Sequence, residues 1–345
     1  MASYSDTRRN ALQYQMSELM NMPEFKRKPS AVIQMLLSNG QTLVSSKERA
    51  KIDAIKSSDQ DTVEVSILDK QAITAGTARA YNHSGSINDS TKATLSFITR
   101  TASFKYSVKQ ADRDAVFTLE QMIAKQMLSA IHSIHDNLET YYLAWLNTNK
   151  SQVANTPSIG AWDGTNYIYG VASGDEDIMF QRFKGFMREQ YYKGQFQMVS
   201  NEFITQKGEF LANQGQGNST NLGWQLSGIN NYGSTELANA SGYQGQGYII
   251  PFGTVGLEPW IPSLNRTGFG NPFQNGGAYY TMPDPLGTGL TFAVHEYASG
   301  ADNQSAAGER QDVDIEVEVS IDTAPVKAIE TTSNSSPIYK IGLLT

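Results

Sequence analysis

The chain has 345 residues, of which 39% are hydrophobic and 18% charged, enough for one large core or two smaller ones. It has no cysteine, which excludes disulfide frameworks, thiolate zinc sites and cysteine nucleophiles. A formal net charge of -7 argues against a protein that binds nucleic acid over its whole surface.

The N-terminal region predicts short helices. Helices are expected over residues 5–20 and 30–38, and residues 47–57 favour a further helical stretch. Residues 1–114 carry 16 Lys and Arg against 12 Asp and Glu, whereas the remainder carries 11 against 22. This imbalance is either chance variation or a sign that the arm of one copy docks on the acidic body of a neighbour.

Neither a membrane span nor a signal peptide is visible. No stretch approaches the roughly 18 apolar residues of a spanning helix, and residues 1–9 lack a basic segment followed by an apolar one. We therefore expect a soluble chain that is made in the cytoplasm.

Two alternating segments, 62–68 and 94–106, predict strands that pair as an antiparallel ribbon. Between them, residues 72–91 form a long polar segment. A structureless loop of this length is unusual inside a compact domain. The segment is therefore either disordered or an extended arm that becomes ordered on another subunit, and we favour the arm.

The strongest periodic signal lies in residues 115–149, where apolar residues recur at steps of three and four: Val116, Leu119, Ile123, Met127, Ile134, Leu138, Tyr141 and Trp145. This pattern predicts one amphipathic helix, about 50 Å long at about 1.5 Å per residue. Such a helix crosses a whole body or serves as its spine. A coiled coil is the competing interpretation, but no partner helix is adjacent in sequence.

His132, His135 and Glu139 lie at helical offsets of three and seven on the polar side of that helix. Zinc accepts such a geometry, yet the His-Glu-x-x-His signature and a fourth ligand are both missing. We interpret the three residues as a solvated helix face and expect no metal.

The middle of the chain alternates helix and strand. A Ser-Gly-Asp-Glu capping box predicts a helix over 173–192, followed by a buried strand at 196–200 and a helix at 202–213. Residues 214–289 are rich in Gly, Asn and Gln, which indicates long ordered loops around short strands such as 247–252.

Strands return at the C-terminus, over residues 290–297, 312–322 and 338–344. In the second of these, apolar residues alternate with an acidic stripe formed by Asp314, Glu316, Glu318 and Asp322. The stripe is a solvated face, a divalent-ion site or a docking face for a basic arm.

No segment combines the features of an enzyme site. The Gly-rich loop at 242–247 precedes a strand, whereas a dinucleotide-binding loop follows a strand and opens a helix. There are four histidines and no matched acid and base pair. We expect no catalytic residue and no cofactor.

The order of these elements resembles the major capsid protein of tailed bacteriophages, the Hong Kong 97 fold. That α+β fold implies an N-terminal arm at 1–61, an extended β-ribbon loop at 62–106 and a central axial α/β domain at 173–289. Its peripheral β domain would combine 107–172 with 290–345 and contain the spine helix at 115–149.

The resemblance implies a structural protein that assembles into an icosahedral shell of hexamers and pentamers around double-stranded phage DNA. Its place would be the virion capsid after synthesis in the bacterial host cytoplasm. Its partners would be further copies of itself, scaffold, portal and decoration proteins, and packaged DNA through non-specific contacts. The candidate interface residues are Arg79, Tyr81, His83, Lys92, Arg100, Trp224, Tyr232, Asp314, Glu316 and Glu318.

Two alternatives share parts of the pattern. An encapsulin is a shell of the same fold that encloses a cargo enzyme instead of a genome. A carbohydrate-binding or adhesion protein would use aromatic platforms, for which Trp224, Tyr232, Tyr243 and Trp260 are the candidates.

Overall fold

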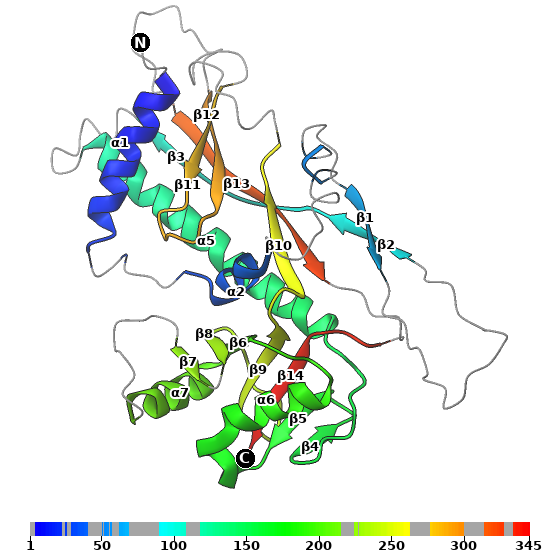
Figure 1. Cartoon of the computed structure of the whole chain (residues 1–345). Coiled ribbons are helices and arrows are strands. Elements are labelled where there is room, and N and C mark those ends of the chain that lie inside the picture. The colour runs from blue at the N-terminus through cyan, green and yellow to red at the C-terminus, as the bar shows by residue number, and fades with distance from the viewer. Residues whose placement is uncertain are drawn as a thin grey trace, which may run out of the picture.

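The computed structural model describes the greater part of the chain, namely residues 4–22, 25, 29–40, 50, 52–54, 56, 62–68, 90–107, 118–214, 224–226, 228–262, 277–299, 314–327 and 334–345. One long helix, α5, runs through the structure (Figure 1). A five-stranded sheet lies along it, and a seven-stranded sheet lies near its C-terminal end.

Helix α5 (Leu119–Thr148) confirms the predicted spine, and its 30 residues make it about 45 Å long. It begins four residues later than predicted because Thr118 forms a capping box. The Thr118 hydroxyl accepts from Gln121 N at 3.3 Å, and the Gln121 side-chain oxygen accepts from Thr118 N at 3.2 Å. Two backbone donors that the helix leaves unpaired are satisfied in this way.

The two predicted N-terminal helices are present as α1 (Tyr4–Leu19) and α2 (Ala31–Gly40). Both pack on α5, and Leu12 and Met16 of α1 and Ile33 of α2 are buried in the same core as the spine. This N-terminal segment is therefore docked on the body of its own chain. Of the predicted helical stretch at 47–57, most residues lie outside the described ones.

The five-stranded sheet lies against α5 and is antiparallel throughout. Its long strand β13 (Asp314–Lys327) pairs over its first part with β3 (Ile98–Ser107) and over its last part with β10 (Val255–Trp260). On its other side β13 pairs with β12 (Thr291–Ser299), which pairs with β11 (Ala278–Pro283).

The segment 94–106 was expected to be one strand of the ribbon, and this prediction is wrong in part. The chain forms two strands that part at Phe97. Strand β2 (Ser90–Ser96) pairs with β1 (Thr62–Leu68) in a two-stranded ribbon, whereas β3 joins β13. The longer apolar strand β13 offers β3 ten paired positions, which the seven-residue ribbon strand does not.

The seven-stranded sheet has a mixed topology and its own core. In spatial order its strands are β4 (Ala161–Asp163), β5 (Ile168–Val171), β14 (Tyr339–Leu344), β9 (Tyr243–Pro251), β6 (Phe196–Ser200), β8 (Ile229–Gly233) and β7 (Trp224–Leu226). The last strand of the chain thus lies beside β5 and β9, whereas β10 and β11 belong to the other sheet. The two sheets do not follow contiguous blocks of sequence.

The predicted helix at 173–192 is divided, and its capping box does not form. Residues Ser173–Ile178 are a 3-10 helix, η2, without a side-chain cap, and α6 (Met179–Glu189) follows it. Asp175 has a non-helical backbone, and its carboxylate pairs with Arg182 at 3.3 Å. The next helix, α7 (Glu202–Gln214), matches the prediction closely.

None of the helices in the described part of the chain combines the length and the apolar character that crossing a membrane requires.

Candidate functional site

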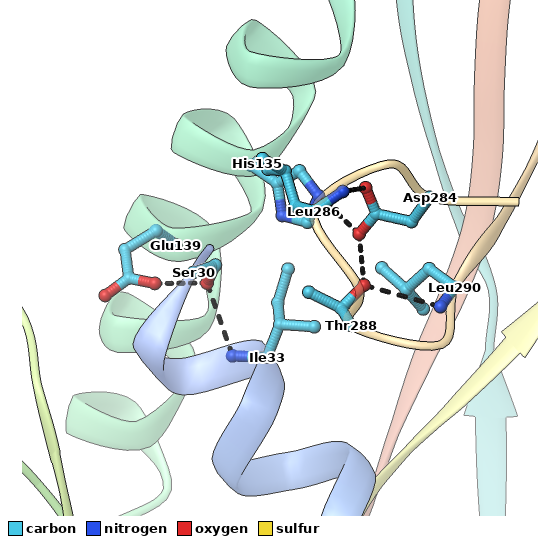
Figure 2. A network of polar contacts seen from close by, with 8 residues as sticks. All are labelled: Ser30, Ile33, His135, Glu139, Asp284, Leu286, Thr288 and Leu290. Atoms are coloured by element: carbon cyan, nitrogen blue, oxygen red, sulfur yellow. Dashed lines mark hydrogen bonds and ion pairs between the residues drawn. The ribbon is translucent and has the colours of Figure 1, made fainter. Parts of the chain in front are cut away.

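The polar residues of α5 form a buried cluster that ties three parts of the chain together (Figure 2). Glu139 is only 6% exposed. Its Oε2 accepts from the hydroxyl of Ser30 and, at 3.3 Å, from Val32 N, and its Oε1 accepts from the hydroxyl of Ser234 at 2.5 Å. Ser30 also caps α2, because Ile33 N donates to its hydroxyl at 3.3 Å. One carboxylate therefore fixes α2 and the end of β8 to the spine, and we call these contacts the Glu139 clasp.

One turn away, His135 forms a second buried contact. Its Nε2 lies 3.0 Å from Asp284 Oδ2, in the turn between β11 and β12. Asp284 Oδ2 also accepts from Thr288, and its Oδ1 accepts from Leu286 N at 2.9 Å. Burial opposes ionisation of Asp284, but these hydrogen bonds and the charge of His135 outweigh it and lower the pKa of this carboxyl. The five-stranded sheet is thereby joined to the spine.

The expectation of a solvated face for His132, His135 and Glu139 is wrong, because all three are less than 9% exposed. Helices α1 and α2 pack on α5 in addition to the sheet, so its polar side is also covered. Within the described ranges, no group of three or more His, Asp or Glu side chains is placed to hold a metal ion. The buried polar side chains serve instead as hydrogen-bonding partners for distant segments.

A second set of buried polar contacts, which sequence reasoning missed, joins the segment ahead of the ribbon to β10 of the five-stranded sheet. The Lys56 ammonium pairs with Glu258 and donates to Pro259 O at 3.0 Å, while Trp260 Nε1 donates to Lys56 O at 3.2 Å. The ring of Phe97 lies 5.2 Å from that of Trp260. The chain thus contacts β10 both ahead of the ribbon, at Lys56, and directly after it, at Phe97. No local pattern in the sequence links residues so far apart.

The acidic stripe on β13 is exposed only in its first part. Glu316 pairs with Lys105 of β3 at 2.5 Å, and this contact raises the pKa of Lys105. Asp314 and Glu318 are also exposed. Asp322, expected on the outer face, is 6% exposed, because β13 is buried on both faces from Ser320 to Ala324.

The structure describes two of the basic residues that were expected at the ribbon, Arg100 and Lys92. Arg100 lies on β3 rather than on the loop, with its guanidinium 4.9 Å from the centre of the Tyr141 ring. Lys92 is on β2 opposite Ser66. The candidates Arg79, Tyr81 and His83 lie outside the described residues.

The aromatic candidates do not form a common platform. Tyr243 and Trp260 are at most 8% exposed, and Tyr232 is half-buried against the core of the spine. Trp224 lies on β7, opposite Asn231. A glycan-binding surface built on Tyr243 and Trp260 is therefore excluded.

No protein-family model matches the sequence, and no curated protein is similar to it at a significant level. Among solved structures, the capsid of Ralstonia phage GP4 aligns over 92% of this chain and 92% of its own, with a TM-score of 0.52 and 7% identity. The chain has a phage capsid fold. A structure from Mycobacterium phage Cain covers 92% of this chain and 91% of its own, at 10% identity and a TM-score of 0.49. The capsid structure of cyanophage P-SCSP1u covers 83% of this chain and 84% of its own, at 9% identity and a TM-score of 0.44.

The capsid fold confirms the predicted α+β architecture.

Proposed function

We propose that the chain is the major capsid protein of a tailed phage and that its role is structural. Copies of it assemble into an icosahedral shell around double-stranded DNA. The observation that carries the proposal is the fold shared with the GP4 capsid over 92% of both chains. Scaffold, portal and decoration proteins are the further candidate partners, and we propose that contacts with the packaged DNA are non-specific.

The ribbon of β1 and β2 supports assembly. Its strands pair with each other and, within the described residues, with no third strand, and the ribbon stands apart from the five-stranded sheet in Figure 1. A two-stranded ribbon alone in water is marginally stable. We infer that the segment 62–96 gains its burial by lying on a neighbouring subunit, so that many weak contacts add up over the shell.

The charges on ribbon and body are complementary. We propose that basic ribbon residues of one copy, including Arg79, His83 and Lys92, face Asp314 and Glu318 of the next. The Lys105–Glu316 pair of the same chain shows that this part of β13 accepts a lysine from an adjacent strand. The aromatic candidates Tyr81, Trp224 and Tyr232 belong to the same proposed set, the last two near the capsomer centre.

The test is assembly of the isolated chain, imaged by negative-stain electron microscopy and sized by light scattering. Closed shells or capsomer rings are expected. The proposal fails if the chain stays a monomer even when its candidate scaffold is co-expressed.

Charge-exchange substitutions test the proposed pairing between Lys92 of one copy and Glu318 of the next. Glu318→Lys should reduce shell yield, and Lys92→Glu in the same chain should restore it in part, because the opposite charges are exchanged. Glu236→Lys, an exposed substitution outside the stripe, is the control. A yield that falls equally in the control, or no rescue by the double variant, would refute the pairing.

A further inference from the structure

Three lysines from separate elements lie near the C-terminal end of α5. Lys150 directly follows the helix, Lys327 ends β13 and Lys340 lies in β14. Lys150 donates to Asn147 Oδ1 at 3.2 Å, and Lys327 donates to Asn149 Oδ1 at 2.7 Å. In Figure 1 this is the region where the lower end of α5 meets the ends of β13 and β14. The cluster therefore lies where the two sheets adjoin.

Lys340 is connected to Lys150 through Tyr248 and Asn147. Its ammonium lies 5.6 Å from the centre of the Tyr248 ring, and the Tyr248 hydroxyl donates to Asn147 Oδ1 at 3.0 Å. Asn147 thus accepts hydrogen bonds from both Tyr248 and Lys150. Asn147 is itself exposed, so the cluster has a side open to solvent.

The lysines have no anionic partner of their own among the described residues. None of them forms an ion pair there, and the carboxylate that acts on Lys150 from a distance is Asp163. Both Asp163 oxygens are already used, since Oδ1 accepts from Thr165 N at 2.8 Å and Oδ2 from Asn166 Nδ2 at 2.8 Å. Among the described residues, the distant carboxylate of Asp163 is thus the one counter-charge that acts on Lys150.

Burial makes this arrangement costly. Burial lowers the pKa of Lys150 and of Lys327, and burial together with the charge of Lys150 lowers the pKa of Lys340 to about 8. A helix C-terminus favours one nearby cation, which accounts for Lys150. It does not account for two further half-buried or buried lysines without a counter-charge.

The backbone beside the cluster is also strained. Tyr167 adopts φ 57°, a left-handed conformation that residues with a Cβ rarely occupy. Its ring lies 5.8 Å from the Lys150 ammonium. Strain of this kind persists where the surrounding structure over-determines it, which is frequent at ligand sites.

We propose that Lys150 and Lys340, with Asn147 beside them, bind an oxyanion of the phosphate class. The two ammonium groups supply several donors and a charge that matches a multivalent anion. The anion would neutralise these two lysines and connect the end of the spine to β14. The proposal is independent of the chain's function as a capsid protein.

The test is thermal unfolding of the full chain in inorganic phosphate against chloride at equal ionic strength. Phosphate should raise the Tm of the wild type, because a ligand that binds the folded state stabilises it. Lys340→Met should abolish the phosphate-specific increase and weaken phosphate binding, measured by titration calorimetry, about tenfold or more. Lys150→Gln, at a more exposed position, provides the same test if the first variant folds poorly.

Lys193→Gln is the matched control, because Lys193 is exposed and lies outside the cluster. It should keep the full phosphate response. An equal response in all four proteins, or none beyond that of chloride in the wild type, would overturn the proposal. If a short DNA duplex also loses affinity in Lys340→Met, the phosphate is that of a nucleic-acid backbone; if the DNA affinity is unchanged, the site takes the free ion.

Sulfate, whose charge is constant from pH 7 to 9.5, provides a pH test. Binding should weaken as pH rises through the pKa of Lys340, because the neutral amine no longer attracts the anion. Around the two lysines, Asp163 stays charged since its pKa is lowered, and Tyr248 stays neutral since its pKa is raised. The pKa of Lys150 is also lowered, so its effect has the same sign as that of Lys340. Sulfate affinity that does not change over this range would contradict the site.

Discussion

Replacing Glu139 with alanine should loosen α2 from the spine. The carboxylate accepts from Ser30, Val32 and Ser234, all buried. A buried donor left without a partner costs about 1–3 kcal/mol, and breaking a buried charged network costs about 3–5 kcal/mol in total. Because the three losses are not additive, we expect the free energy of unfolding to fall by about 3–5 kcal/mol, a large part of the about 5–15 kcal/mol typical of a folded domain.

The conservative variant separates charge from size. In Glu139→Gln the side-chain volume is kept, and the amide accepts one hydrogen bond and donates another. The loss should be about 1–2 kcal/mol, because only the charge-assisted part of the hydrogen bonds is removed. Asn137→Ala, exposed on the same helix, should change the free energy of unfolding by less than about 0.5 kcal/mol.

Urea unfolding gives the magnitudes, and amide hydrogen exchange shows where the effect is located. Exchange should accelerate in α2 of Glu139→Ala, at Val32 and Ile33 above all, while β13 keeps its protection relative to the global stability. If Glu139→Ala costs no more than Asn137→Ala, or if α2 is not selectively loosened, the clasp does not hold the N-terminal segment.

Three further predictions follow from single contacts. The pKa of Asp284 is lowered in the folded state, so ionised Asp284 stabilises the fold above the ordinary pKa of about 3.8, and this stabilisation is lost as pH falls through the folded pKa. In urea unfolding measured against pH, Asp284→Asn should therefore reduce the loss of stability at acid pH. Gly277→Ala should lower stability by about 2–3 kcal/mol in thermal unfolding, because φ is +74° and the new Cβ would lie 2.5 Å from Glu296 O. A double-mutant cycle of Lys56→Met and Glu258→Gln should give a coupling energy above about 1 kcal/mol, since both side chains are largely buried; a value near zero would show that the pair is dispensable.

The sequence predicted the spine well because its signal is local. Apolar residues repeat at helical spacing over many turns from Leu119 onward, and no other structure satisfies that period. The same pattern misled about the polar side of the helix. Amphipathicity shows which face is apolar, but it does not show that α1, α2 and the turn at Asp284 also cover the other face.

The sequence predicted where strands occur more reliably than it predicted which strands pair with each other. Alternation in 94–106 identifies strand structure, yet only tertiary pairing decides that β2 stays with β1 while β3 joins β13. The pairing of β14 with β5 and β9 is equally remote in sequence. Long-range contacts of this kind leave no local signature, and the Lys56–Glu258 pair, which spans about two hundred positions, was missed for the same reason.

The positions of the buried polar contacts bear on how the chain would assemble. The Glu139 clasp holds α2 on its own body, and Lys56, ahead of the ribbon, and Phe97, directly after it, both contact β10. Among the described elements, β1 and β2 thus pair only with each other, while the chain before and after them is held on β10. A ribbon that leaves a rigid body at a fixed place loses less conformational freedom when it meets a neighbour. If the chain assembles as proposed, the same buried contacts that stabilise one subunit would also hold the ribbon in place for its contact with the next.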